Sequence, residues 1–290
     1  MPDDNSLDIF GTKPLAKAVE KAAEKSVDGL GAFFGAICMP AAEEFGLLLR
    51  DKVAVFRTRN LEAIAQKTRQ KIDQLDLTPS GDANPLLLKQ VIEDASWIDD
   101  ASIQSMWAGL LTVASSVRSA ADDSLIYTEA LKRLTPFQAR LVNKIYGDPR
   151  CCSVKSPIAS HSESVFYPEN MLIYTVNDVL RQYPGDLSEI VPIENVTHEE
   201  ILAEKADQGI ALSRFRPQIE ALVTLGLIHE VHFFERDGQG IKVFPSLKGL
   251  DFYMRCQGYS VYPLEAFILN LQYWCGLKGI DPFTYVPVRT

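Results

Sequence analysis

The sequence predicts a mainly α-helical protein, with an N-terminal all-α helical bundle followed by a smaller α+β domain. Three observations predict this class. Apolar residues recur at helical spacing through most of residues 14–147, the clearest strand pattern is a hairpin within 228–244, and prolines interrupt the chain between 148 and 195. At 290 residues and 47% hydrophobic composition, the chain is long enough to bury more than one core.

The centre of the predicted bundle is the segment from Ala101 to Val117, which has no charged residue. One of its faces is apolar and includes Trp107, whereas the opposite face carries small residues such as Gly109. Because small residues behind an apolar stripe allow a second element to pack closely, we expect a core helix that is covered on both sides. Asp99 and Asp100 precede it and are expected to cap its first turn.

Further helices are expected on both sides of this segment, and capping residues or prolines mark the start of several of them. They run from Pro14, from Pro40 to about Asp73, from Asn84-Pro85 to Ala95, from Ser124 to Leu134, and from Thr135-Pro136 to Gly147. The helix that begins at Asn84-Pro85 is expected to bury one side, made of Leu86, Leu87, Val91 and Ile92.

A second uncharged run covers Gly29 to Ala42 and contains a G-x-x-x-G spacing formed by Gly31 and Gly35. This spacing lets two helices approach closely in a bilayer, but these fourteen residues are too few to span one. Two hypotheses stay open, a buried helical corner and a membrane-inserting or oligomerising hairpin. The candidate contacts with a partner or a membrane are Gly31, Phe33, Phe34 and Gly35.

Changes in composition divide the chain into five parts. Residues 1–13 are expected to lack fixed structure, residues 14–147 form the bundle, and residues 148–195 form a linker region with a short helix. Residues 196–258 form the second domain, and residues 259–290 form an aromatic C-terminal extension that we expect to pack on the body.

The second domain has the order helix, helix, hairpin, helix, which is the order of a winged helix-turn-helix. Thr197 opens a capping-box pattern at the first helix, and Ser213 is expected to begin the second. Strands are expected at 228–235 and 241–244, joined by a turn that contains Asp-Gly, and Ser246 is expected to cap the closing helix. We therefore predict a helical bundle followed by a winged-helix-like α+β domain.

A winged helix invites comparison with DNA-binding proteins, in which basic residues contact phosphates and base edges. Arg214 and Arg216 are expected near the start of the second helix and Lys242 on the hairpin, while the long helix before Asp73 adds further basic residues. The candidate nucleic-acid contacts are Arg57, Arg59, Arg69, Arg214, Arg216 and Lys242. The net charge of −9 and the nearly neutral hairpin disfavour this role.

No arrangement of residues predicts an enzyme, a metal site or a bound cofactor. His229 and His232 lie three residues apart on a predicted strand, so their side chains point to opposite faces and a shared metal is not expected. No glycine-rich phosphate loop or nucleophile motif occurs, and no small-molecule substrate is identified. The five cysteines include no C-x-x-C and follow no secretory signal, which favours reduced thiols in the cytoplasm.

Several motifs together resemble the bacterial Abi-alpha family, and the likeness covers most of residues 15–257. The motifs are Pro40–Gly46, Glu93–Asp100 with Met106–Leu111, and Leu222–Ile228 with Leu247–Phe252 and Cys256. The family's name implies a part in abortive infection, the defence in which an infected bacterium stops growing or dies before phage can spread. The resemblance implies no catalytic residue. Ser246 stands where the family usually has Thr, and both residues can cap a helix.

The leading hypothesis is a non-enzymatic antiphage protein that is cytoplasmic and acts through protein–protein or membrane contacts. It implies self-association or a protein partner, and it implies membrane association on activation if residues 29–42 are a switchable element. The alternative hypothesis is a winged-helix DNA-binding transcriptional regulator. A third hypothesis is an enzyme whose site carries no recognisable motif.

Overall fold

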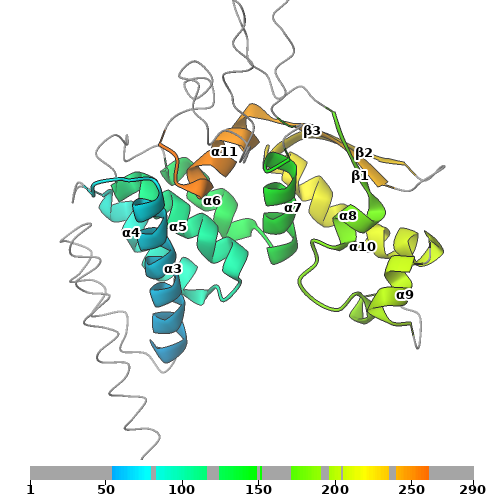
Figure 1. The fold of residues 1–290 in the computed structure, drawn as a ribbon, viewed down its shortest axis with the longest axis horizontal. Helices are drawn as coiled ribbons and strands as arrows, with labels where there is room; N and C mark the ends of the chain where they lie inside the picture. The colour runs from blue at the N-terminus through cyan, green and yellow to red at the C-terminus, as the bar shows by residue number, and fades with distance from the viewer. Residues whose placement is uncertain are drawn as a thin grey trace, which may run out of the picture.

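The computed structural model describes residues 54–79, 83–115, 124–148, 151, 171–190, 196–203, 205–234 and 240–260. Over these ranges the protein is mainly helical with one small antiparallel sheet, as predicted (Figure 1). The elements in chain order are α3 (Ala54–Gln74), α4 (Pro85–Glu93), η1 (Ala95–Trp97), α5 (Ala101–Ser115), α6 (Leu125–Arg133), α7 (Pro136–Tyr146), β1 (Leu172–Thr175), α8 (Val176–Leu180), η3 (Leu187–Glu189), α9 (His198–Ala203), α10 (Lys205–Thr224), β2 (Ile228–Phe234), β3 (Gly240–Pro245) and α11 (Leu247–Gln257).

Helix α5 lies at the centre of the helical part, and both α3 and α11 pack on it (Figure 1). Trp107 is fully buried on its apolar face. Gly109 lies so close to α11 that a Cβ at this position would overlap the backbone carbonyl of Cys256. The prediction of a core helix covered on both faces is therefore confirmed, and the small residue is what permits the close approach.

Local side-chain chemistry starts the helices where the sequence predicts. Asp100 Oδ1 accepts hydrogen bonds from two amides of the first turn of α5, at 2.9 and 3.0 Å. Asn84 Oδ1 accepts one at 2.8 Å at the start of α4, and Thr135 forms a capping box at the start of α7. Ser246 Oγ accepts the amide three residues later at 2.9 Å and begins α11. Each bond satisfies an amide that has no partner within its helix.

The buried side of α4 differs from the prediction at one residue. Leu86 was expected in the core, but half of its surface is exposed, and Leu88 is buried in its place. Leu87 and Leu88, together with Val91 and Ile92 one turn later, form a single stripe on the helix. Leu86 falls outside that stripe, because three consecutive leucines cannot all face the same side of a helix.

The sheet has the strand order β1-β3-β2, and both pairs of neighbours are antiparallel. The hairpin of β2 and β3 confirms the two predicted strands. Strand β1 was missed, since it lies in the region 148–195 that was expected to be a linker with a short helix; the short helix is α8. Leu172 pairs with Val243 and Tyr174 with Ile241. The alternation of buried and exposed residues in β1 covers only four positions, which is too short to predict a strand. Its partner strand β3 also lies far along the chain, so no local pattern indicates the pairing.

Helix α10 is one continuous helix, so the prediction that Ser213 begins a helix is wrong. Ser213 lies in its interior and donates its hydroxyl to the Ile210 carbonyl at 2.6 Å. Pro217 also lies inside the helix, where it removes one backbone donor. The helix continues because its buried residues form an unbroken stripe whose packing outweighs that loss; they are Ala211, Leu212, Phe215, Ile219 and Leu222.

The buried side chains of the helical part and of the sheet region form one hydrophobic cluster. Phe137 of α7 stacks on Phe215 of α10 with 4.4 Å between ring centroids, and the Tyr146 hydroxyl donates to the Leu227 carbonyl. Helix α7 therefore connects the two parts of the chain on either side of residue 148, where the boundary was predicted.

Several predictions lie outside the described residues. They concern the helix from Pro14, the run of residues 29–42 and residues 261–290 of the aromatic extension. Among the residues that the structure describes, no helix is both long and apolar enough to cross a bilayer.

Candidate interaction surface

One face of the sheet packs on α8 and α10, and no described helix lies over the other face (Figure 1). Strand register sets which side chains share this second face, because neighbouring partners point to the same side. Ile173, Lys242 and His232 form one row across the three strands, and Phe244 and Glu230 form the next. We call this surface the outer sheet face and define it by Met171, Ile173, Glu230, His232, Phe234, Lys242 and Phe244.

The outer sheet face carries exposed apolar side chains. Ile173 is 47% exposed, and Met171, two residues earlier on the same side of the chain, is 44% exposed. The phenyl rings of Phe234 and Phe244 are half-buried beside them. Contiguous apolar groups of this kind on a protein surface are typical of a binding site, because their exposure to water is unfavourable.

The polar side chains of the outer sheet face are held by contacts within the face. Glu230 Oε1 lies 2.8 Å from His232 Nε2, and the His232 ring meets the Phe244 ring edge-on at 5.7 Å between centroids. Lys242 Nζ lies 5.7 Å from the centre of the Phe234 ring. These contacts join polar and aromatic side chains within the face, whose surface is therefore of mixed character.

Gly240 explains how Phe234 lies on this face. A Cβ at residue 240 would stand 2.9 Å from Cζ of Phe234 and would overlap the Tyr174 carbonyl. The glycine therefore lets the phenyl ring lie across β3 and cover the backbone of the neighbouring strand. Local sequence patterns indicate Lys242 and His232 as notable residues, but they do not reveal the face that these residues share, because β1 completes it.

Arg57 does not fit the role of a nucleic-acid contact. Its side chain is buried, and its guanidinium donates to Ser96 Oγ at 3.0 Å and to the Ile92 carbonyl at 3.1 Å. The guanidinium also lies over the ring of Trp97, at 5.0 Å from the ring centre. The sequence placed Arg57 on a solvated basic face, but its hydrogen bonds tie α3 to the end of α4 inside the protein.

The remaining basic candidates lie in three separate places. Arg59 and Arg69 are exposed on α3, whereas Arg214 and Arg216 are exposed on α10, at the other end of the molecule (Figure 1). The two α10 arginines lie in the middle of the helix, not at its start as predicted. Lys242 belongs to the outer sheet face. The structure therefore does not bring the predicted nucleic-acid contacts together.

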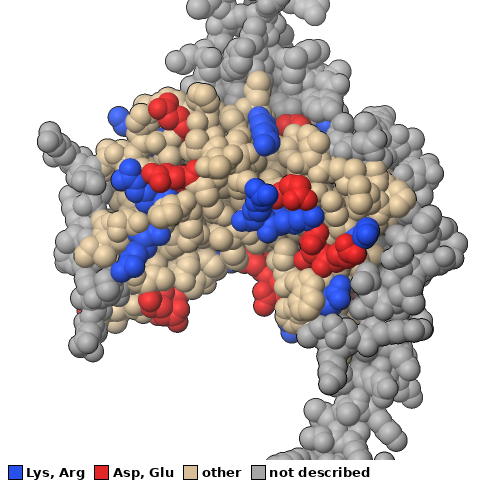
Figure 2. All heavy atoms as spheres, turned by 180° about the vertical axis from the view of Figure 1, so that it is seen from behind, with Lys and Arg blue, Asp and Glu red and all other residues tan. Residues whose placement is uncertain are grey.

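Acidic and aromatic neighbours also engage several of these cations. Arg216 Nε pairs with Glu220 at 2.9 Å, and its guanidinium lies over the Phe233 ring at 4.8 Å. The Arg59 guanidinium lies 5.6 Å from the Phe56 ring centre. Figure 2 shows basic side chains standing beside acidic ones on the face that it draws. A strongly positive surface, which a phosphate backbone would require, is not seen on that face.

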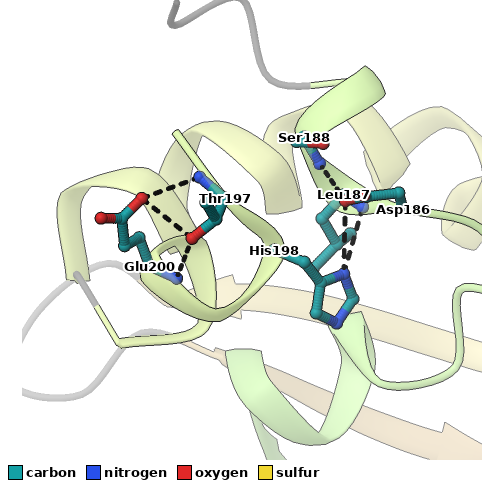
Figure 3. A network of polar contacts seen from close by, with 6 residues as sticks. All are labelled: Asp186, Leu187, Ser188, Thr197, His198 and Glu200. Atoms are coloured by element: carbon teal, nitrogen blue, oxygen red, sulfur yellow. Dashed lines mark hydrogen bonds and ion pairs between the residues drawn. The ribbon is translucent and has the colours of Figure 1, made fainter. Parts of the chain in front are cut away.

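A second polar network surrounds the start of α9 (Figure 3). The Thr197–Glu200 capping box is present as predicted, with the Thr197 amide donating to Glu200 at 2.8 Å, and this bond lowers the pKa of the Glu200 carboxyl. Asp186 accepts the Ser188 amide at 2.9 Å, which lowers its pKa, and His198 Nδ1 accepts the Leu187 amide at 3.2 Å. These bonds fix the turns around η3 and α9.

The described thiols are unsuited to nucleophilic chemistry. Burial raises the pKa of Cys151 to about 12 and also raises that of Cys256, so both stay protonated. Burial lowers the pKa of the nearby Lys71, whose ammonium donates to the Gln257 carbonyl at 3.2 Å. Within the described ranges, no group of three or more His, Cys, Asp or Glu side chains could hold a metal ion.

The candidate contacts Gly31, Phe33, Phe34 and Gly35 lie outside the described residues. No curated protein and no solved structure is significantly similar to the chain. The model of the family described as abortive infection alpha matches residues 57–237, from α3 to just beyond the end of β2, which is more than half of the chain. The match includes the motif around η1 and α5, whereas Pro40–Gly46 and Leu247–Cys256 lie beyond it. The chain therefore belongs to the Abi-alpha family.

Proposed function

We propose that this protein serves abortive infection as a non-enzymatic protein that acts by binding another protein through its outer sheet face. The observation that carries the proposal is the exposure of Ile173 and Met171 on a face whose charged groups already have contacts within it. Binding a partner there would bury apolar surface, and complementary charges on the partner would pair Glu230 and Lys242, whose contacts in this chain are with His232 and the Phe234 ring. Membership of the Abi-alpha family supports the biological role.

We further propose that the sheet region is a winged-helix-like module used for binding protein. The element order α7, β1, α8, η3, α9, α10, β2, β3, with β3 at the centre of the sheet, supports this assignment. Helix α10 would take the place of the recognition helix. Its exposed residues include Ile210, Ser213, Arg214, Arg216, Pro217 and Glu220, and Arg216 pairs with Glu220, so this face lacks the strongly positive character that DNA recognition requires.

A phage-plaque assay tests the role of the outer sheet face. Ile173→Lys places a charge in the centre of the apolar surface, and we expect bacteria that carry this variant to lose protection against phage. Ile126→Lys is the matched control, because Ile126 is 65% exposed on α6, outside the sheet. It should keep protection, and both variants should melt like the wild type. Full protection with Ile173→Lys would exclude the face from the mechanism.

Filter binding with duplex DNA at low and moderate salt tests the alternative of a transcriptional regulator. We expect no retention at low salt, because the candidate cations are dispersed and Arg57 is buried. An affinity that falls steeply with salt would instead support the regulator.

A further inference from the structure

We infer that the outer sheet face binds the outer sheet face of a second copy of this chain. The inference rests on the proposed function, since it assumes that this face is the binding surface, and it names the partner. Three properties of the face favour a second copy as the binding partner: its apolar content, its charge balance and the arrangement of its charges.

The apolar content provides the driving force. Ile173 and Met171 are nearly half exposed on β1, and Phe244 lies half-buried on the central strand. Two sheets pack face to face by interdigitating such residues, and β-branched and aromatic side chains suit this kind of packing. Each copy would cover the apolar residues that the other exposes.

The charge balance removes the main obstacle to self-association. The whole chain has a net charge of −9, so two copies repel each other when arbitrary surfaces meet. The outer sheet face carries one lysine and one glutamate, Lys242 and Glu230, and is therefore nearly neutral when His232 is uncharged. Contact through this face brings together no excess of negative charge.

The arrangement of the two charges is self-complementary. Glu230 pairs with Phe244 and Lys242 pairs with His232, so Lys242 and Glu230 are diagonal neighbours on the same face. A twofold axis in the plane of the contact, passing near Phe244, exchanges their positions. Lys242 of each copy then meets Glu230 of the other, and the two Phe244 rings meet close to the axis. Such an isologous contact repeats each favourable pair twice.

Sedimentation velocity on the full chain, over a wide range of protein concentrations, measures the association. We expect the wild type to dimerise, and Ile173→Lys to weaken the dimer by at least about tenfold, since a lysine would replace an apolar contact at the interface. Ile126→Lys, the control outside the sheet, should dimerise like the wild type. A wild type that stays monomeric throughout, or an Ile173→Lys variant that dimerises normally, would overturn the inference.

Charge exchange tests the pairing itself. Glu230→Lys places two lysines on each face and Lys242→Glu places two glutamates, so each variant alone should dimerise at least about tenfold more weakly than the wild type. Mixed in equal amounts, the two variants should form a heterodimer, because each lysine again meets a glutamate. Failure of the mixture to associate would contradict this pairing, provided that thermal melting shows both variants folded.

The two proposals can fail separately. If the chain dimerises through this face but Ile173→Lys still protects bacteria, the inference holds and the proposed function fails. If the chain is monomeric but Ile173→Lys abolishes protection, the function holds with a different protein partner and the inference fails.

Discussion

Gly109 of α5 lies directly against the backbone of Cys256 in α11, with no room for even a methyl group between them. Two helix backbones therefore touch at the centre of the protein. This contact joins α5, the central helix of the bundle, to α11, the helix that follows the hairpin. Helix α11 can occupy its position only because residue 109 has no side chain.

We expect Gly109→Ala to reduce the free energy of unfolding by about 3 kcal/mol or more, because the obstructing atoms are backbone and cannot rotate away. Urea denaturation measures the change. Gly185→Ala is the control, since its Cβ would meet only side-chain atoms of the half-buried Tyr183, the nearest at 2.9 Å, and it should cost clearly less than Gly109→Ala. Equal stability of Gly109→Ala and the wild type would show that the two helices are not in this contact.

Asp100→Ala should lower stability by about 1 kcal/mol, because the carboxylate satisfies two amides at the start of α5. Asp100→Asn should retain most of this stability, since an asparagine oxygen can accept the same bonds. Asp99→Ala is the matched control and should be nearly neutral, as Asp99 is exposed and accepts neither bond. Thermal denaturation of the three variants separates the cap from a general effect of negative charge.

Stability should fall at alkaline pH. Burial is the main cause that raises the pKa of Cys151 from its ordinary 9.0 to about 12 and the pKa of Tyr253 from 10.0 to about 12. The unfolded chain loses these protons first, so the stabilisation is complete below pH 9.0 and disappears as the pH rises towards 12. Between its ordinary and its raised pKa, each group makes the free energy of unfolding fall by about 1.4 kcal/mol per pH unit.

Urea unfolding between pH 8 and pH 11 checks this expectation. Cys151→Ala should remove the contribution of one titrating group from the slope of the unfolding free energy against pH. The slope that remains reports the buried tyrosines and Cys256. An identical slope in Cys151→Ala and in the wild type would contradict the assignment of a buried, protonated thiol.

Residues 29–42 yield a prediction about growth arrest. If the G-x-x-x-G spacing mediates close contact, the double variant Gly31→Leu/Gly35→Leu should abolish growth arrest during infection without changing the melting temperature. Ala32→Leu/Ala36→Leu adds the same bulk at the same spacing, one residue later, and should leave growth arrest intact. Arrest by the glycine double variant would remove this segment from the mechanism.

The elements that the sequence predicts well depend on neighbours along the chain. Asn84, Thr135 and Ser246 cap helices by accepting hydrogen bonds from amides two or three residues away, and a long uncharged run predicts α5. Arg57 lies in the basic helix that the sequence predicts before Asp73. Nothing near Arg57 in the sequence indicates that Ser96 and the Ile92 carbonyl will accept hydrogen bonds from its guanidinium. A buried arginine and a solvated one have the same local pattern.

The sequence by itself determined the helical class, the positions of the caps, the hairpin and the family, because these follow from periodicity and from hydrogen bonds between residues close together in the chain. Only the tertiary structure decided that Leu172–Thr175 is a strand, that α10 continues through Pro217, and that Ile173, Lys242 and His232 share one face. These features arise from pairing and burial between distant segments, whose free energy no local pattern records.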